Sequence, residues 1–267
     1  MIVTPTVLLL CALAACLATA YALRGGLTST NKLTMLGMDA QGIGISLLSV
    51  AAAVWFFGAT FGLALIAVIV IHEFGHVAAF RVAGHHDARF RLVPLLGGYA
   101  ISNRPVKTQE DQVFISLMGP AIGIAPMLLA YGLTPFSAQY FPAAISPLLT
   151  FASICGALNF FNLLPIWPLD GGKLTASITS VFHDRAPFCI FVTSTALIGL
   201  VALLTQSIFI GFIVIMGIQH IVKTGGSDGR APHARMSKNH AFLCLGAWLF
   251  SAAALFIGGL ATILRFV

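Results

Sequence analysis

The stretch FGLALIAVIVIHEFGH, residues 61–76, joins a long apolar run to two histidines and a glutamate. No charged side chain precedes His72 within this run. Such a run is typical of a helix that crosses a lipid bilayer, where about 20 mostly apolar residues cover about 30 Å of hydrocarbon. The chain therefore places side chains that can bind metal or transfer protons inside a predicted membrane helix.

The spacing of the polar residues in this helix predicts a zinc site. His72 and His76 are four residues apart, which corresponds to about 400° of helix rotation, so both imidazoles share one face. Glu73 lies where a general base could reach a metal-bound water. The alternative is a pair of core histidines beside a glutamate. Burying these groups in an apolar span costs several kcal/mol unless something compensates them, and one Zn²⁺ per chain would do so.

The composition indicates a membrane protein. Hydrophobic residues make up 58% of the 267 residues and charged residues 8%, whereas soluble proteins carry about 25% charged residues. The mean hydropathy is +0.97. The net charge of +6 arises from basic residues scattered through short loops, which favours a topology signal over a nucleic-acid partner.

We predict an all-α polytopic membrane protein of about eight transmembrane helices with a short membrane-associated β-hairpin. Two pairs of the predicted spans adjoin, and a single helix over either pair would be about 60 Å long, roughly twice the bilayer. Basic residues follow the first, third, fifth and seventh spans and are absent after the second, fourth and sixth. This alternation places those loops in the cytoplasm and both termini opposite. The predicted spans are 2–23, 43–60, 61–83, 111–133, 143–164, 187–204, 207–223 and 241–264.

Two further segments and the cysteines also carry predictions. Residues 89–102, RFRLVPLLGGYAIS, are strand-like but broken by proline and glycine, which predicts a hairpin in the headgroup region. Residues 2–21 form either a signal peptide or, as the missing basic n-region favours, a retained helix. The five cysteines lie in apolar segments without a CxxC pair, so we expect small buried side chains and no disulfide framework.

A third metal ligand is predicted at the end of the fifth span, in the stretch NLLPIWPLDGG, residues 162–172. Its only carboxylate is Asp170, and the charge-derived topology brings this residue to the same side as His72 and His76. Pro165 and Pro168 break the helix, and the two glycines after Asp170 permit a tight turn. The alternative for Asp170 is an ordinary helix-end carboxylate in the headgroup region.

HEFGH, followed about ninety residues later by NLLPIWPLDG, resembles the site-2 protease family of intramembrane zinc metalloproteases. The GGY stretch from Gly97 and the MGP stretch from Met118 are similar to that family's glycine-rich membrane hairpin and its GP helix start. The resemblance covers about residues 45–180. It implies that His72, His76 and Asp170 bind zinc, that Glu73 activates water, and that Asn162, Gly97 and Gly98 contact the substrate.

The resemblance also implies a division of the chain and marks where it departs from the family. We expect an additional N-terminal helix and loop at 1–42, a catalytic membrane core at 43–185 and C-terminal transmembrane helices at 186–267. No PDZ-sized insertion separates the two motifs, and no CBS-like domain follows them. The asparagine that the family often carries shortly after the GP motif is absent, with Gly123 and Ile124 in that region.

The expected function is hydrolysis of a peptide bond in or near the transmembrane segment of a single-span membrane protein. We expect a bacterial inner-membrane location, an active site toward the cytoplasm and a regulatory membrane partner in place of the absent modules. One alternative is a catalytically idle homologue that binds membrane partners, although Glu73 and the ligand set are intact. Another is a metal transporter, which would need polar residues in several spans.

Overall fold

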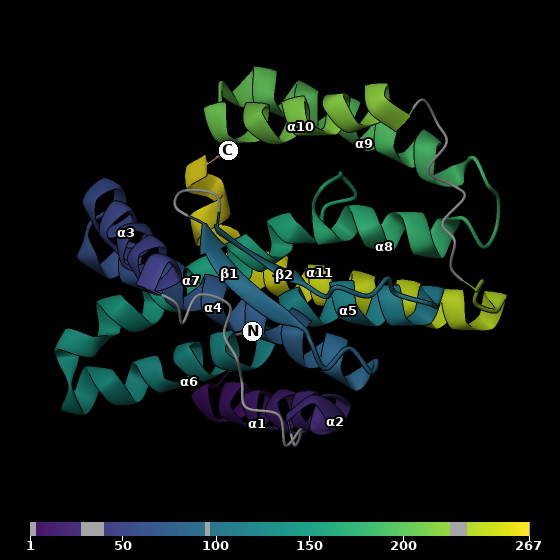
Figure 1. Cartoon of the computed structure of the whole chain (residues 1–267). Coiled ribbons are helices and arrows are strands. Elements are labelled where there is room, and N and C mark those ends of the chain that lie inside the picture. Colours follow the sequence, from purple (N-terminus) through teal and green to yellow (C-terminus); the bar gives the residue numbers. More distant parts are fainter. Residues whose placement is uncertain (1–3, 28–39, 94–96, 225–233, 267) are drawn as a thin grey trace.

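The computed structural model describes the chain except for residues 1–3, 28–39, 94–96, 225–233 and 267. The described residues form helices and one pair of short strands (Figure 1). The strands are β1 (Arg89–Val93) and β2 (Gly97–Ile101). The helices are α1 (Pro5–Ala22), α2 (Arg24–Leu27), α3 (Ala40–Phe57), α4 (Ala59–Val82), α5 (Gln109–Ala121), α6 (Ile124–Tyr140), the 3-10 turn η1 (Pro142–Ala144), α7 (Ile145–Asn162), α8 (Asp170–Thr179), α9 (Ala186–Thr205), α10 (Ile208–Thr224) and α11 (Lys238–Phe266).

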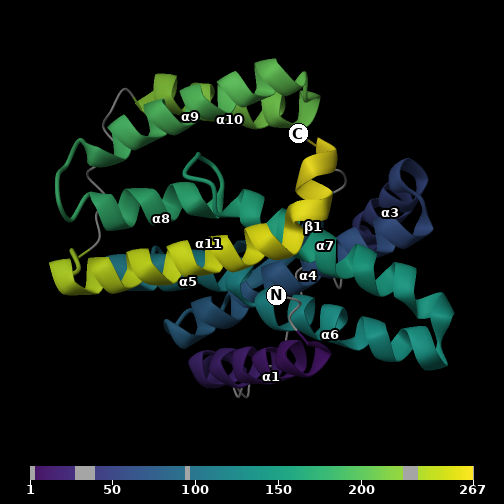
Figure 2. The same ribbon diagram turned by 180° about the vertical axis from the view of Figure 1, so that it is seen from behind.

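The helices lie in layers. In both views α9 and α10 run side by side along one edge of the molecule, and α1 lies against α6 along the opposite edge (Figures 1 and 2). Between these edges α4 packs against α3, α5 and α7, and α11 packs against α7. The HEFGH helix is therefore the inner member of the bundle, which explains why its polar face is covered.

Length and hydropathy confirm a helical integral membrane protein. Two further apolar helical segments, Ser46–Phe57 and Ile208–Lys223, are shorter than a full span, so the count of eight stays a prediction. Among the described residues, the six segments long and apolar enough to cross a membrane are Pro5–Ala22, Ala59–Val82, Gln109–Tyr140, Pro142–Asn162, Ala186–Thr205 and Lys238–Arg265.

The two adjoining pairs of predicted spans are each interrupted, as expected. α3 and α4 are separated by Gly58, whose φ of 79° is accessible to glycine but costly for other residues. α9 ends at Thr205, and the next residue, Gln206, adopts a left-handed conformation with φ 54° before α10 begins. The two helices of each pair then pack against each other.

The predicted span 111–133 lies within the apolar segment Gln109–Tyr140, which consists of two helices, α5 and α6. α5 begins after Thr108, whose hydroxyl accepts the Asp111 N–H, and it ends at Ala121. Pro120 lies inside α5 near its end, and its ring removes one backbone donor just before α6 begins. The Gly119–Pro120 pair therefore lies in the last turn of α5, not at a helix start, and the break between the two helices follows it at Ile122 and Gly123.

The structure also corrects the place of Asp170. α7 ends at Asn162, and a loop of residues 163–169 leads into α8, a helix that the sequence did not predict. Asp170 is the first residue of α8 and does not end the fifth span. Its position in a helical first turn suits a carboxylate, because backbone N–H groups there lack partners within the helix.

β1 and β2 pair antiparallel, with Arg89 opposite Ile101 and Val93 opposite Gly97. The predicted turn between them falls on residues 94–96, outside the described residues. β1 packs against α3, and β2 packs against α4. The strand pair therefore covers part of the HEFGH helix, while its position at the membrane surface stays a prediction.

The expectation that all five cysteines are small buried side chains is wrong for three of them. Cys155 is buried and Cys244 is partly buried, but Cys11, Cys16 and Cys189 are exposed. The exposed cysteines lie on α1 and α9, both apolar enough to cross a membrane. A free cysteine behaves as a small hydrophobe, so exposure to lipid on a membrane helix would carry little cost. All five thiols are free, in agreement with the absence of a disulfide framework.

Candidate metal centre

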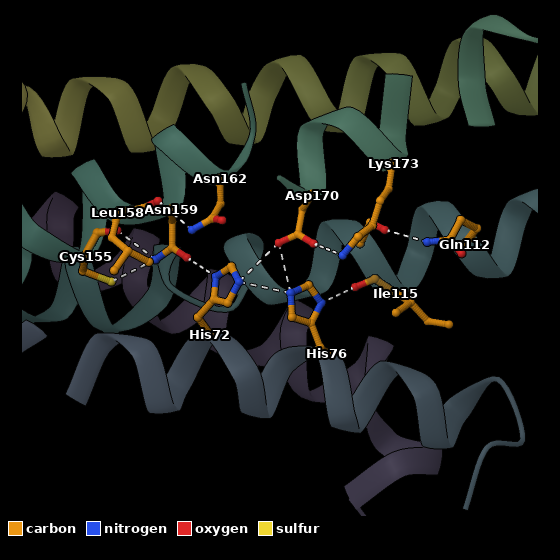
Figure 3. Close-up of polar contacts among 11 residues, drawn as sticks. His72, His76, Gln112, Ile115, Cys155, Leu158, Asn159, Asn162, Asp170 and Lys173 are labelled. Carbon is orange, nitrogen blue, oxygen red and sulfur yellow. Dashed lines mark hydrogen bonds and ion pairs between the residues drawn. The ribbon is translucent and has the colours of Figure 1, made fainter. Parts of the chain in front are cut away.

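Three side chains from two helices converge in the interior. The Nε2 atoms of His72 and His76, one turn apart on α4, lie 3.0 Å from each other. Oδ2 of Asp170 lies 3.2 Å from Nε2 of His72 and 3.0 Å from Nε2 of His76 (Figure 3). All three residues are at most 6% exposed. The predicted ligand set is thus one buried cluster that could hold a metal ion.

The two glycines after Asp170 allow the loop to fold back on the start of α8. A Cβ on Gly171 would clash with the backbone oxygens of Leu163 and Leu164. A Cβ on Gly172 would lie 2.7 Å from the carbonyl oxygen of Ile166. Because both clashes involve backbone atoms, only glycine lets the loop wrap tightly enough to present Asp170 to the two imidazoles.

The hydrogen bonds behind the histidines fix their tautomers. Nδ1 of His76 lies 2.7 Å from the carbonyl oxygen of Ile115, which can only accept. Nδ1 of His72 lies 2.7 Å from Oδ1 of Asn159, and the amide nitrogen of Asn159 donates to the carbonyl of Cys155. Each Nδ1 therefore donates, which leaves each Nε2 as an acceptor that points into the cluster.

This arrangement fits a cation. Two imidazole lone pairs and a carboxylate oxygen face one another with no donor among them, and a positive ion between them would relieve the repulsion. With zinc-to-ligand bonds of about 2.0–2.1 Å, neighbouring ligand atoms of a tetrahedral site are about 3.3 Å apart. The observed separations of 3.0 to 3.2 Å are close to that value. Three protein ligands leave one position for water, as in catalytic zinc sites.

Glu73 lies beside the cluster under strand β2. The side chain is 5% exposed, and its Oε2 atom has no hydrogen-bond partner among the described residues. A Cβ on Gly98 would lie 2.7 Å from Cγ of Glu73. The backbone of β2 therefore packs so closely on Glu73 that a side chain at position 98 would displace the glutamate.

The described hydrogen bond of Asn162 and the strand pairing of Gly97 lie outside the ligand cluster. The amide nitrogen of Asn162 donates to the carbonyl of Leu158 in its own helix, and the side chain is partly buried. Gly97 pairs with Val93 in the strand register. The structure therefore groups five of the seven predicted site residues, and the substrate-binding roles stay predictions.

Two neighbours of the cluster were missed by the sequence analysis. Asn159 is 1% exposed on α7, and a buried amide in an apolar span is itself a signal of a functional site. Lys173 lies one turn after Asp170 on α8, with Nζ 3.0 Å from Oδ1 of Asp170. Because helix α8 was not predicted, nothing in the sequence indicated that Asp170 and Lys173 share a helix face.

Comparison with known proteins bears on the same residues. Residues 137–206 match the sequence model of peptidase family M50, a segment that includes Asp170 but not HEFGH. The chain is 33% identical over 129 residues to stage IV sporulation protein FB of Bacillus subtilis, covering 47% of this chain and 41% of that protein. It is 31% identical over 119 residues to zinc metalloprotease MJ0392 of Methanocaldococcus jannaschii, covering 42% of this chain and 32% of that protein.

The chain spans less than half the length of these relatives. The family match and a relative named as a zinc metalloprotease nevertheless agree with the ligand geometry. The resemblance of this chain to the site-2 proteases, peptidase family M50, is therefore confirmed.

Proposed function

We propose that this protein is an intramembrane zinc metalloprotease that hydrolyses a peptide bond in or near the transmembrane segment of a membrane-anchored protein. The observation that carries the proposal is the convergence of His72, His76 and Asp170 beside Glu73. The helix that bears three of these residues is apolar enough to cross a membrane. A soluble protease would have no use for a catalytic helix of that kind.

Each residue of the proposed site has its own role in the hydrolysis. Bound zinc would polarise the scissile carbonyl and lower the pKa of a coordinated water toward about 7. His72 and His76 hold their Nε2 atoms toward that position, and Asp170 adds its Oδ2 atom. Glu73, whose Oε2 atom lacks a partner among the described residues, takes the proton of the attacking water and gives it to the leaving amine. Hydrolysis thus adds one water molecule across the peptide bond, giving a carboxylate and an amine.

Strand β2 supports a role in substrate binding. A carbonyl locked in helical hydrogen bonds is a poor target, so the substrate segment must unwind and become extended. β2 lies against α4, and Gly98 lies over Glu73. An extended segment added along β2 would pass the catalytic glutamate, in the manner of strand addition. Gly97 and Gly98 leave room for that backbone, and Asn162 is proposed to hold the same segment.

The remaining properties follow from the proposed role. The alternation of basic loops supports about eight spans with the active site toward the cytoplasm. We place the protein in a bacterial inner membrane, with residues 43–185 as the catalytic core and a regulatory membrane partner. A metal transporter is less well supported, since the searched part of the chain contains one potential ligand group.

The proposal is tested with Glu73→Gln in full-length protein purified in detergent. This variant should retain about one zinc per chain but lose cleavage, and it should trap membrane proteins that mass spectrometry can identify. Each trapped protein is then co-expressed with the wild type to look for cleavage. Glu110→Gln is the control, because the Glu110 side chain is 42% exposed at the start of α5 and pairs with His240. Undiminished cleavage by Glu73→Gln, or wild-type protein without zinc, would overturn the proposal.

A further inference from the structure

Asn159 connects helix α7 to the first metal ligand. Its Oδ1 accepts from Nδ1 of His72 at 2.7 Å, and its Nδ2 donates to the carbonyl of Cys155 at 2.8 Å (Figure 3). The amide is therefore held at both ends within a residue that is 1% exposed. An amide flip would place Oδ1 against the carbonyl oxygen of Cys155, so the bond to Cys155 sets the orientation of the amide and leaves Oδ1 to accept from His72.

The space for this amide comes from Gly123, between α5 and α6. A Cβ at position 123 would lie 2.5 Å from Nδ2 of Asn159 and 3.0 Å from Sγ of Cys155. The φ of Gly123 is −69°, which any residue adopts, so glycine is not needed there for its backbone. Its missing side chain is what lets the amide sit beside His72.

The two histidines are supported in different ways. His76 donates to the backbone carbonyl of Ile115, an acceptor that no side-chain substitution removes. His72 depends on a side chain for the equivalent bond. Partners of this kind orient a metal-binding imidazole and raise its basicity, and their loss typically weakens metal binding about 10–100-fold.

We infer that Asn159 is a positioning residue that fixes the tautomer and ring orientation of His72, and that Gly123 is required to keep the amide in place. The inference rests on the proposed zinc site. It assigns to α7 a role in metal binding in addition to carrying the loop that leads to Asp170. Both residues act on zinc affinity through His72, without contacting the metal.

The inference is tested by zinc affinity, measured on full-length variants in detergent by competition with a chromophoric chelator. Asn159→Leu keeps the size but removes the acceptor and should weaken zinc binding about tenfold or more. Asn159→Asp keeps an accepting oxygen and should stay closer to the wild type. Gly123→Ala leaves Asn159 in the sequence but displaces its amide, so it should also weaken binding. The visible spectrum of the Co²⁺-substituted protein should change in both weakened variants.

Two controls separate positioning from general damage. Ser153→Ala removes a buried hydroxyl from the same helix, one that bonds to Thr262 at 2.6 Å, and should not alter zinc affinity. Gly211→Ala adds a methyl group where no atom lies within 4 Å.

Wild-type zinc affinity in folded Asn159→Leu overturns the inference. If that variant does not fold, unchanged affinity in Gly123→Ala overturns it instead. Wild-type protein that binds no zinc would be a failure of the proposed function itself, and a distinct result.

Discussion

Nζ of Lys173 lies 3.0 Å from Oδ1 of Asp170, while Oδ2 of the same carboxylate faces the two imidazoles. The two oxygens of Asp170 are therefore divided between a cation on its own helix and the metal cluster. Lys173 follows Asp170 by three residues, a spacing at which side chains of a helix are neighbours. This pairing keeps Oδ1 away from the metal position and favours a single bond from Asp170, which leaves room for water.

Replacing Lys173 by Met should weaken zinc binding only modestly. The Lys173 side chain is 38% exposed, so water screens its charge, and exposed ion pairs contribute about 0–1 kcal/mol. A change of roughly threefold to fivefold in zinc affinity is expected, together with a changed Co²⁺ spectrum as Asp170 turns. Lys238→Met, at the exposed start of α11, is the control. An identical affinity and spectrum in Lys173→Met would show that the pair is incidental.

Replacing Gly119 by Ala should be far more damaging to the metal site. A Cβ there would clash with the imidazole ring of His76 at its Nε2 and Cε1 atoms. Ala is intrinsically better than Gly in a helix by about 0.5–1 kcal/mol, so the substitution has a favourable local term. Displacing a ligand should outweigh that term, and zinc affinity should fall at least about a hundredfold in protein that still folds. Retained zinc affinity would mean that His76 does not bind the metal through Nε2.

The same gain in helix propensity without the clash is available at Gly211. No atom lies within 4 Å of a Cβ added there. Gly211→Ala should therefore leave zinc affinity unchanged and should not lower the thermal unfolding temperature. Comparing the two glycine variants isolates the contact with His76 from the effect of the methyl group on the helix.

The stability of the junction between α4 and the strand pair should depend on pH, because Asp87 lies at this junction. Its Oδ2 accepts the N–H of Asn103 at 2.7 Å, and the hydroxyl of Ser102 donates to the same carboxylate. The bond from Asn103 is the main reason that the pKa of Asp87 lies below its ordinary value of 3.8. A carboxyl group with a lowered pKa stabilises the fold above its unfolded pKa, and the contribution is lost as the pH falls through the folded pKa.

Amide hydrogen exchange of residues 97–103, corrected for the intrinsic effect of pH, should therefore rise in acid. Asp87→Asn should remove that acid transition, because an amide does not titrate in this range. Asp184 pairs with Arg235 elsewhere on the surface, so Asp184→Asn is the control and should retain the acid transition. The same acid transition in Asp87→Asn would mean that another group holds β2 to α4.

The sequence predicted the parts of the site that follow from spacing and hydropathy. HEFGH was predicted to lie on a helix because an apolar run precedes it and its histidines are four apart, and Asp170 was predicted from the break in the fifth span. Helix α8 was missed because Gly171 and Gly172 are typical of turns. Tertiary packing, in which the loop folds back on these glycines, overrides their low helix propensity.

Asn159 was missed for a different reason. An isolated amide in an apolar run has no partner in the sequence, since His72 lies 87 residues away. The structure also gives a reason for the departure from the site-2 protease pattern. Gly123 stands in the region where that family often has an asparagine, and the amide of Asn159 lies against it. A contact between residues of two helices could not be derived from either helix alone.

The loop of residues 163–169 is held by three helices that follow it in the chain. The hydroxyl of Ser194 on α9 donates to the carbonyl of Pro165 at 2.7 Å. Nε1 of Trp248 on α11 donates to the carbonyl of Leu163 at 3.0 Å. The ring of His220 on α10 stacks on Trp167 with centroids 4.5 Å apart. The C-terminal helices therefore help to determine where Asp170 lies.

Removing the Ser194 hydroxyl should accordingly loosen Asp170 without touching the cluster. A typical hydrogen bond contributes about 0.5–1.5 kcal/mol, so Ser194→Ala should weaken zinc binding about twofold to tenfold. Thr193→Val is the matched control, because the Thr193 hydroxyl is exposed and bonds only to Cys189 of its own helix among the hydrogen bonds described. If the two variants bind zinc equally well by chelator competition, the loop is rigid without α9. If Ser194→Ala alone is weaker, the C-terminal helices contribute to the metal site through the backbone of the loop.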